Sequence, residues 1–284
     1  MAEDKRNKIE DTINAVTGLA KAVPIYDDAL QPAAKEIGKS LETVAKTVNV
    51  ALAPLRALVW GYDQIEGFVS KNVTEKLRNT PKEEIISPSP NVAGPALEAL
   101  RYAGHEESLR ELYANLLASS MDAATASTAH PGFVEILKQI TPDEAKLLVI
   151  LAPNRPLPLL NVRAENKDRN MGGRDVLVNF SLYGEEAGCE HVHLTPSYLD
   201  NLSRLGLIEV PTFYEYKYPN VYAPLENHPT VKAVKEQIEQ TDTMRCVIQK
   251  RGIRVTQLGR QFINSCVVDH ASKRPENKSE IKPT

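Results

Sequence analysis

The sequence predicts a mainly α-helical protein with a smaller α+β part, in which an N-terminal helical region is followed by a C-terminal winged-helix-like domain. Through the first 150 residues, apolar side chains recur in steps of three and four, the spacing that places them on one face of a helix. Beyond residue 153, short apolar runs alternate with glycine-containing polar turns, which is typical of strands. We therefore expect N-terminal amphipathic helices over residues 1–82, a helical domain over 83–153, a winged-helix-like α+β domain over 154–268 and a disordered tail over 269–284.

Two amphipathic stretches make up the N-terminal segment. Residues 9–23 carry an apolar stripe that ends at Pro24, and a longer stripe with the same spacing follows, with Pro54 predicting a kink inside it. An apolar helix face has to be covered, so we predict that this one packs against the domain behind it, against helices of a second copy or against another protein. We call it the helix-assembly face, and its residues are Leu41, Val44, Val48, Leu55, Leu58, Tyr62 and Ile65.

Residues 48–62 leave a membrane interpretation open. They contain one charge, Arg56, and end with Trp60 and Tyr62, aromatic residues that favour a water–lipid boundary. Fifteen residues fall short of the roughly 20 that cross a bilayer, and a central arginine would cost about 2.5–3.5 kcal/mol. A membrane surface is therefore an alternative partner, and a membrane-acting, cell-killing effector is an alternative function.

The middle segment is predicted to be a block of short helices. Prolines between residues 81 and 95 form a connector that a helix cannot cross, and apolar stripes follow it over residues 96–103, 108–121 and 133–140. Thr141, Pro142 and Glu144 form a capping-box pattern, in which the Thr141 hydroxyl and the Glu144 carboxylate bind free backbone amides. A further helix is expected to begin there and to end near Pro153.

The same segment carries a family resemblance. Its motifs are PALEAL at 95–100, ELYANLLASSMD at 111–122, HPGF at 130–133 and TPDEAK at 141–146. These motifs resemble the bacterial Abi-alpha family, which is associated with abortive phage infection, and the resemblance extends over roughly residues 30 to 268. It implies a role in antiphage defence. It implies no catalytic residue, because most of the motif residues are helix formers and caps.

The C-terminal third is predicted to mix strands and helices. Apolar runs on both sides of a polar, glycine-containing turn predict a hairpin or an irregular insertion between residues 153 and 188. A helix that Thr195 caps is expected to end at Gly206, and strands are expected at 207–210 and 244–255 around a polar helix at 230–240. Thr256 is expected to cap a last helix. This order resembles a winged-helix module with a helix inserted in the wing.

A run of cations inside this module is the candidate nucleic-acid or partner patch. Between Met244 and Cys266 there is no Asp or Glu, so the run has a local excess of five positive charges that suits phosphates. The candidate recognition helix offers only Arg204 for reading bases, beside the acidic Asp200, so a DNA-binding regulator is the weaker alternative. The patch residues are Arg245, Lys250, Arg251, Arg254 and Arg260.

Catalytic, cofactor and metal sites are not predicted. Cys189, His191 and His193 are the densest metal-capable group, but a structural zinc needs four ligands, and the other two cysteines are distant in sequence. Residues 142–146 resemble a nuclease motif only superficially, since one helical turn holds them all. Phosphate-loop, zinc-protease and serine-hydrolase signatures are missing from the sequence. We expect no small-molecule substrate, no cofactor and no enzyme activity.

Composition points to a cytoplasmic protein. The chain of 284 residues has 34 Lys and Arg against 37 Asp and Glu, a net charge of −3, so no overall basic field favours nucleic acid. The three cysteines are scattered, which fits a reducing compartment, and the N-terminus is too polar for a signal peptide. Peripheral membrane association stays open. The leading prediction is a non-enzymatic bacterial antiphage protein that acts by protein–protein contact or self-assembly.

Overall fold

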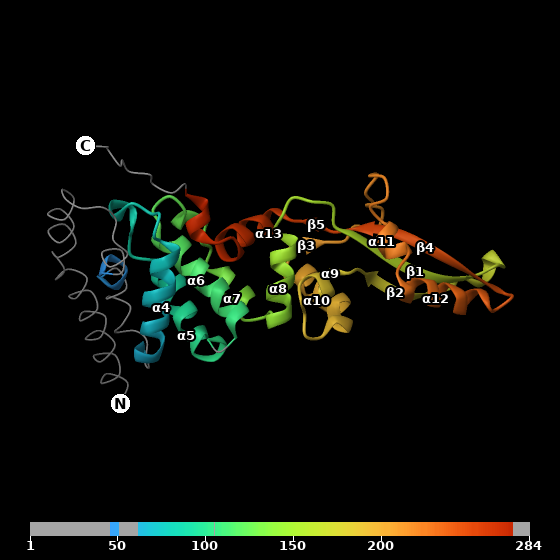
Figure 1. Cartoon of the computed structure of the whole chain (residues 1–284), viewed down its shortest axis with the longest axis horizontal. Helices are drawn as coiled ribbons and strands as arrows, with labels where there is room; N and C mark the ends of the chain where they lie inside the picture. The colour runs from blue at the N-terminus through green and yellow to red at the C-terminus, as the bar shows by residue number, and fades with distance from the viewer. Residues whose placement is uncertain (1–45, 51–61, 105, 275–284) are drawn as a thin grey trace, which may run out of the picture. The chain divides into compact units, whose positions relative to one another are not determined.

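The structure is a computed structural model, and it describes residues 46–50, 62–104 and 106–274 (Figure 1). The predicted fold class is confirmed, because a helical region precedes a smaller α+β part. The elements are, in chain order, α4 (Tyr62–Lys76), α5 (Pro90–Ala103), α6 (Glu107–Met121), α7 (Gly132–Leu137), α8 (Pro142–Leu151), β1 (Pro158–Asn166), β2 (Gly173–Phe180), α9 (Tyr183–Glu186), α10 (Thr195–Arg204), β3 (Ile208–Glu209), α11 (Ala223–Glu226), α12 (Pro229–Glu239), β4 (Met244–Gly252), β5 (Arg254–Val255) and α13 (Gln257–Phe262).

Helix α6 is the centre of the helical region. Its residues from Leu112 to Met121 are all buried, as expected for a helix that neighbours surround on every side. Helices α4, α5, α7 and α8 pack against it, together with a π-helical turn at Ile263–Val267. The apolar cluster that forms this core runs from Val48 to Cys266. Residues distant in sequence therefore share one core.

The helix-assembly face lies mostly outside the described residues. Leu41, Val44, Leu55 and Leu58 belong to the part that the structure does not describe, as do the side chains of Tyr62 and Ile65. Val48 is described, and it is fully buried.

The apolar spacing continues into α4 beyond this face. Val69, Val73 and Leu77 are fully buried, and α4 packs on α6. This end of the stripe is thus covered by the chain itself.

Most of the 48–62 stretch also lies outside the described residues. Among the helices that are described, none has the length and apolar character needed to cross a membrane.

The α+β part contains a three-stranded antiparallel sheet. Strands β1 and β2 form the predicted hairpin, and β4 pairs with the other edge of β1, so the order is β2-β1-β4. On one face, Val162 and Ala164 pack with Val231 of α12, while Leu160 packs with Leu225 of α11. The sequence does not reveal the pairing of β4 with β1, because about 80 residues separate their partners along the chain.

Strands β3 and β5 form a second, two-stranded sheet in which Ile208 pairs with Val255. The chain expected as one strand over 244–255 is thus divided between two sheets. The order α10, β3, β5, α13 is the part that matches the winged-helix interpretation, which stays a prediction.

Most of the expected helix caps are present. The Thr141 hydroxyl accepts a hydrogen bond from the Glu144 amide, and the Glu144 carboxylate accepts one from the Thr141 amide, so the capping box is confirmed. Thr256 caps α13 through the Gly259 amide. Thr195 does not cap α10. It already has helical backbone angles, because a 3₁₀ turn precedes it, and its hydroxyl donates to the Val192 carbonyl at 2.6 Å.

Candidate functional site

The cations of the predicted patch do not form a free positive surface. Arg245 pairs with Glu165 of β1 at 2.8 Å, a residue 80 positions away in sequence. Lys250 pairs with Glu226 at 3.0 Å and lies over the Tyr222 ring, 5.3 Å from its centroid. The sequence run is free of acids, but tertiary pairing brings acids to it.

The other three patch residues are likewise engaged in contacts or dispersed. Arg254 pairs with Glu209 across β3 and β5 at 2.7 Å. Arg251 donates from Nη2 to the Val210 carbonyl at 3.2 Å. Arg260 lies on α13, away from the β4 strand that carries Arg245. With three of its five cations in ion pairs, the patch presents much less charge to phosphates than its sequence indicates.

The segment around Cys189, which holds the metal-capable side chains, is bound to the start of α8 by hydrogen bonds. The Asp143 carboxylate at the start of α8 accepts hydrogen bonds from the amides of Glu190 and His191, both at 2.9 Å. The Tyr198 hydroxyl donates to the same carboxylate at 3.2 Å. Within the described residues, no group of three or more His, Cys, Asp or Glu side chains is arranged to hold a metal ion.

Asp143 is held in its charged form. Burial alone would raise the pKa of Asp143, but the amides of His191 and Glu190 and the ion pair with Lys146 outweigh burial and lower it to about 2. Asp143, in the first turn of α8, thus ties this helix to the loop before α10.

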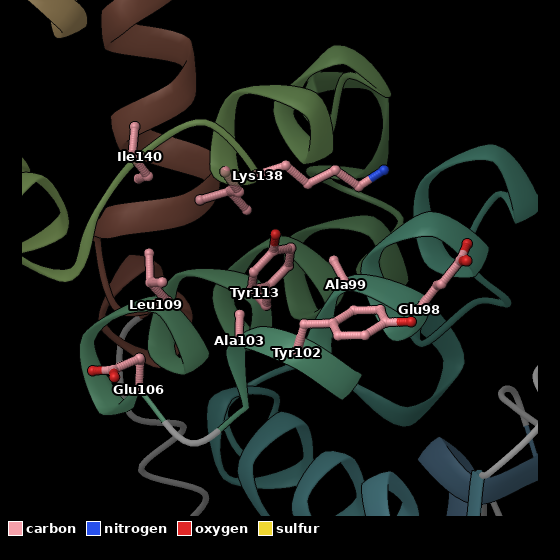
Figure 2. A pocket seen from close by; sticks show the side chains of 10 residues that line it. Glu98, Ala99, Tyr102, Ala103, Glu106, Leu109, Tyr113, Lys138 and Ile140 are labelled. Carbon is pink, nitrogen blue, oxygen red and sulfur yellow. The ribbon is translucent and has the colours of Figure 1, made fainter.

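A groove between α5, α6 and α7 has a volume of about 480 Å³ (Figure 2). Buried apolar side chains such as Leu109 and Leu137 lie beneath it, and Tyr102 stands at its mouth with 73% of its surface exposed. Figure 2 shows the carboxylates of Glu98 and Glu106 at opposite ends of the group. The lining residues are Glu98, Ala99, Tyr102, Ala103, Glu106, Leu109, Tyr113, Leu137, Lys138 and Ile140.

Two carboxylates, those of Glu98 and Glu106, and one cation line the groove. Lys138, its one cationic side chain, pairs with Glu135 at 2.9 Å, so that charge is already partly neutralised. Burial raises the pKa of the Tyr113 phenol, and the nearby Glu135 raises it further, so the hydroxyl stays protonated at neutral pH. An apolar floor with carboxylates at its ends suits an apolar side chain or helix face that carries a cation.

Sequence reasoning did not find this groove. Tyr102 is the only signal that it offered, since an aromatic residue at the polar end of α5 breaks the apolar stripe of that helix. Whether Tyr102 faces a neighbour or solvent depends on how α5 and α6 pack, and the sequence does not determine that.

A second set of polar groups is buried where the C-terminal segment meets α6. The Asp122 carboxylate accepts hydrogen bonds from Thr80 Oγ1 at 3.2 Å, His270 Nε2 at 3.0 Å and Arg274 Nη2 at 2.6 Å. Nδ1 of His270 lies 3.3 Å from Ser119 Oγ. No catalytic or metal-binding signature in the sequence contains this set of residues.

Ser, His and Asp are the residue types of a hydrolase triad, but here they are sealed in the core. Ser119 and Asp122 are fully buried, and the Ser119 hydroxyl donates to the Ser265 carbonyl at 2.9 Å. A catalytic serine faces a cleft and donates to its histidine instead. The set therefore works as a structural network.

This network orders the beginning of the segment expected to be a disordered tail. Residues 270–273 form a 3₁₀ turn and His270 is buried, while residues 275–284 lie outside the described residues. Burial would raise the pKa of Asp122, but the Ala124 amide, Arg274 and His270 hold it below its usual range. Burial and the neighbouring Lys273 lower the pKa of His270. The residues are ordered because they supply the partners of a buried carboxylate.

Comparison with known proteins gives one family. Residues 61–266 match the family described as abortive infection alpha, which is more than half of the chain. A solved structure of an uncharacterized protein from the hydrocarbon-degrading marine bacterium Alcanivorax borkumensis SK2 is 23% identical, over 49% of this chain and 92% of that chain. Its TM-score is 0.32, too low for the likeness to bear on function. No curated protein matches the chain.

Proposed function

The chain belongs to the abortive infection alpha family, and from that premise we propose that it serves antiphage defence by binding another protein chain, without enzyme chemistry of its own. The groove between α5, α6 and α7 is the observation that carries this proposal. It combines a buried apolar floor, an exposed tyrosine at its mouth and carboxylates at its ends. Tyrosine in such a setting is typical of the centre of protein interfaces.

Protein contact has more support than DNA binding. Nucleic-acid affinity depends on cations that are free to neutralise phosphates. In the predicted patch, Arg245, Lys250 and Arg254 already pair with carboxylates of the same chain. The groove, in contrast, keeps an apolar recess that no side chain of residues 46–50, 62–104 and 106–274 fills.

The proposal is tested by phage challenge of bacteria that express variants of the chain. Tyr102→Asp places a third carboxylate in the groove, and because Tyr102 is mostly exposed, the fold should tolerate the change. Val149→Asp on α8 is the matched control, since Val149 is 55% exposed on a helix and does not line the groove.

We expect loss of protection with Tyr102→Asp and retention with Val149→Asp, at equal expression and equal unfolding midpoints. Full protection by a folded Tyr102→Asp protein would overturn the groove as the contact site. Loss of protection with both variants would show that the effect is not specific to the groove.

A further inference from the structure

The segment between β3 and α11 presents aromatic side chains to solvent. Phe213 is 97% exposed and Tyr218 is 64% exposed, although large apolar side chains are usually covered. Tyr214, Tyr216 and Tyr218 form a continuous row of rings, with centroids 5.3 Å and 6.4 Å apart. We call Phe213, Tyr214, Tyr216 and Tyr218 the aromatic knob.

The aromatic knob is held in place by hydrogen bonds to the neighbouring strands. The Tyr216 hydroxyl donates to the Ile253 carbonyl at 2.8 Å. The Tyr216 amide donates to the Tyr222 hydroxyl at 2.9 Å, and that hydroxyl donates to the Arg251 carbonyl at 2.9 Å. A Cβ on Gly252 would lie 2.7 Å from the Tyr216 ring, so only glycine allows this close approach. A knob that is already ordered loses less conformational entropy when it binds.

We propose that the aromatic knob of one copy inserts into the groove of a second copy, so that the chain assembles head to tail. This inference rests on the proposed function and names a second copy of the chain as the partner that the groove binds. Residues of the aromatic knob do not line the groove of their own copy, so the knob and the groove are two separate surfaces. A contact between two different surfaces builds rings or filaments, not closed two-fold dimers.

The two surfaces are complementary in chemistry. The groove is apolar at its floor and acidic at its ends, while the aromatic knob brings Phe213 and, beside it, Lys217 with an 82% exposed side chain. Lys217 pairs with Glu215 within the same loop. Exposed pairs of this kind contribute only about 0–1 kcal/mol, so Lys217 can exchange that partner for Glu98 of the second copy.

Contact through one knob is smaller than a standard interface, so we expect each contact to be weak and assembly to depend on concentration. Sedimentation velocity of the full chain across increasing concentration measures this directly. The average mass of the wild-type chain should rise with concentration. Phe213→Asp alone and Tyr102→Asp alone should each stay monomeric, while Val149→Asp should assemble like the wild type.

An equimolar mixture of Phe213→Asp and Tyr102→Asp is the decisive sample. The first variant keeps an intact groove and the second keeps an intact knob, so the mixture should form dimers and nothing larger. A mixture that stays monomeric overturns the proposal, as does assembly of either variant alone or a wild-type chain that stays monomeric at every concentration. Zero-length carbodiimide coupling between Lys217 and Glu98 of different copies, read by mass spectrometry of isotope-mixed chains, should appear only when assembly occurs.

Phage challenge separates this inference from the proposed function. If Phe213→Asp protects fully while Tyr102→Asp does not, the groove binds a different protein, and head-to-tail assembly is wrong although the proposed function stands. If both variants fail to protect and Val149→Asp protects, the two proposals agree.

Discussion

Replacing Arg274 with alanine should destabilise the fold far more than its position near the C-terminus indicates. Arg274 donates to Asp122 from Nε at 3.0 Å and from Nη2 at 2.6 Å, and it also pairs with Glu84. The Asp122 carboxylate is fully buried, so the substitution removes a charged partner from a group that water does not reach.

The expected loss follows from the contacts that remain. Asp122 would keep its hydrogen bonds from Thr80, from the Ala124 amide and from His270. Removing one partner of a buried ion pair costs about 3–5 kcal/mol, and Arg274 is 21% exposed, which reduces that cost. We therefore expect the free energy of unfolding to fall by about 2–4 kcal/mol.

Urea denaturation followed by circular dichroism measures this difference. Arg78→Ala is the control, because the Arg78–Glu75 pair is exposed on both sides and should change stability by at most about 1 kcal/mol. Equal midpoints for the two variants would refute the role given to Arg274.

The pH dependence supplies a second check on the same residue. The pKa of Asp122 is lowered in the folded state, so the stability that it contributes is present above its ordinary value of 3.8 and is lost as pH falls below it. Without Arg274 that pKa rises, so the gap between wild type and Arg274→Ala should narrow below about pH 4. A gap that stays constant down to pH 3 would contradict this account.

Four further substitutions test local features of the fold by the same urea assay. Thr141→Ala removes the side-chain acceptor of the Glu144 amide and should cost about 1 kcal/mol, and no loss would mean that the capping box is not needed. Gly259→Ala places a Cβ against the Leu207 carbonyl and should destabilise by about 1–3 kcal/mol. Gly67→Ala, at an exposed position of α4 where a Cβ would meet no atom within 4 Å, should stabilise by about 0.5–1 kcal/mol. The reverse order would be incompatible with the packing described. Asp143→Asn should lower the free energy of unfolding at neutral pH and flatten the decline of that free energy between pH 4 and 2. The reason is that the pKa of Asp143 in the folded state is about 2, so the stability that its charge contributes is lost only as pH falls toward that value. The same decline in the variant as in the wild type would argue against a stabilising role for the Asp143 charge.

The sequence determined the elements whose signals are local. The capping box at Thr141, the cap at Thr256 and the positive φ of Gly206 at the end of α10 each depend on a few neighbouring residues, and all three are present. The hairpin of β1 and β2 is also local, because one short turn joins the two strands. The apolar stripe of α6 was predicted as well, whereas the burial of its polar residues Asn115 and Ser119 depends on contacts with the remote residues 265–266.

Tertiary structure alone decided the two candidate surfaces, the patch of cations and the groove. The acid-free run around Arg245 and Arg254 predicts a positive patch, but Glu165 and Glu209 reach it from strands elsewhere in the sequence. The groove exists because α5, α6 and α7 pack against one another, and the residue spacing within one helix does not reveal that packing.

The ordered position of His270 in the core also depends on tertiary structure. Its segment is polar, and this composition predicts a disordered tail. The segment is nevertheless ordered, because the buried carboxylate of Asp122, 148 residues earlier, requires hydrogen-bond partners. Local propensity depends on neighbouring residues, so it can be derived from the sequence alone. Charge neutralisation, recesses and buried polar networks depend on distances between remote residues, and only the folded chain sets those distances.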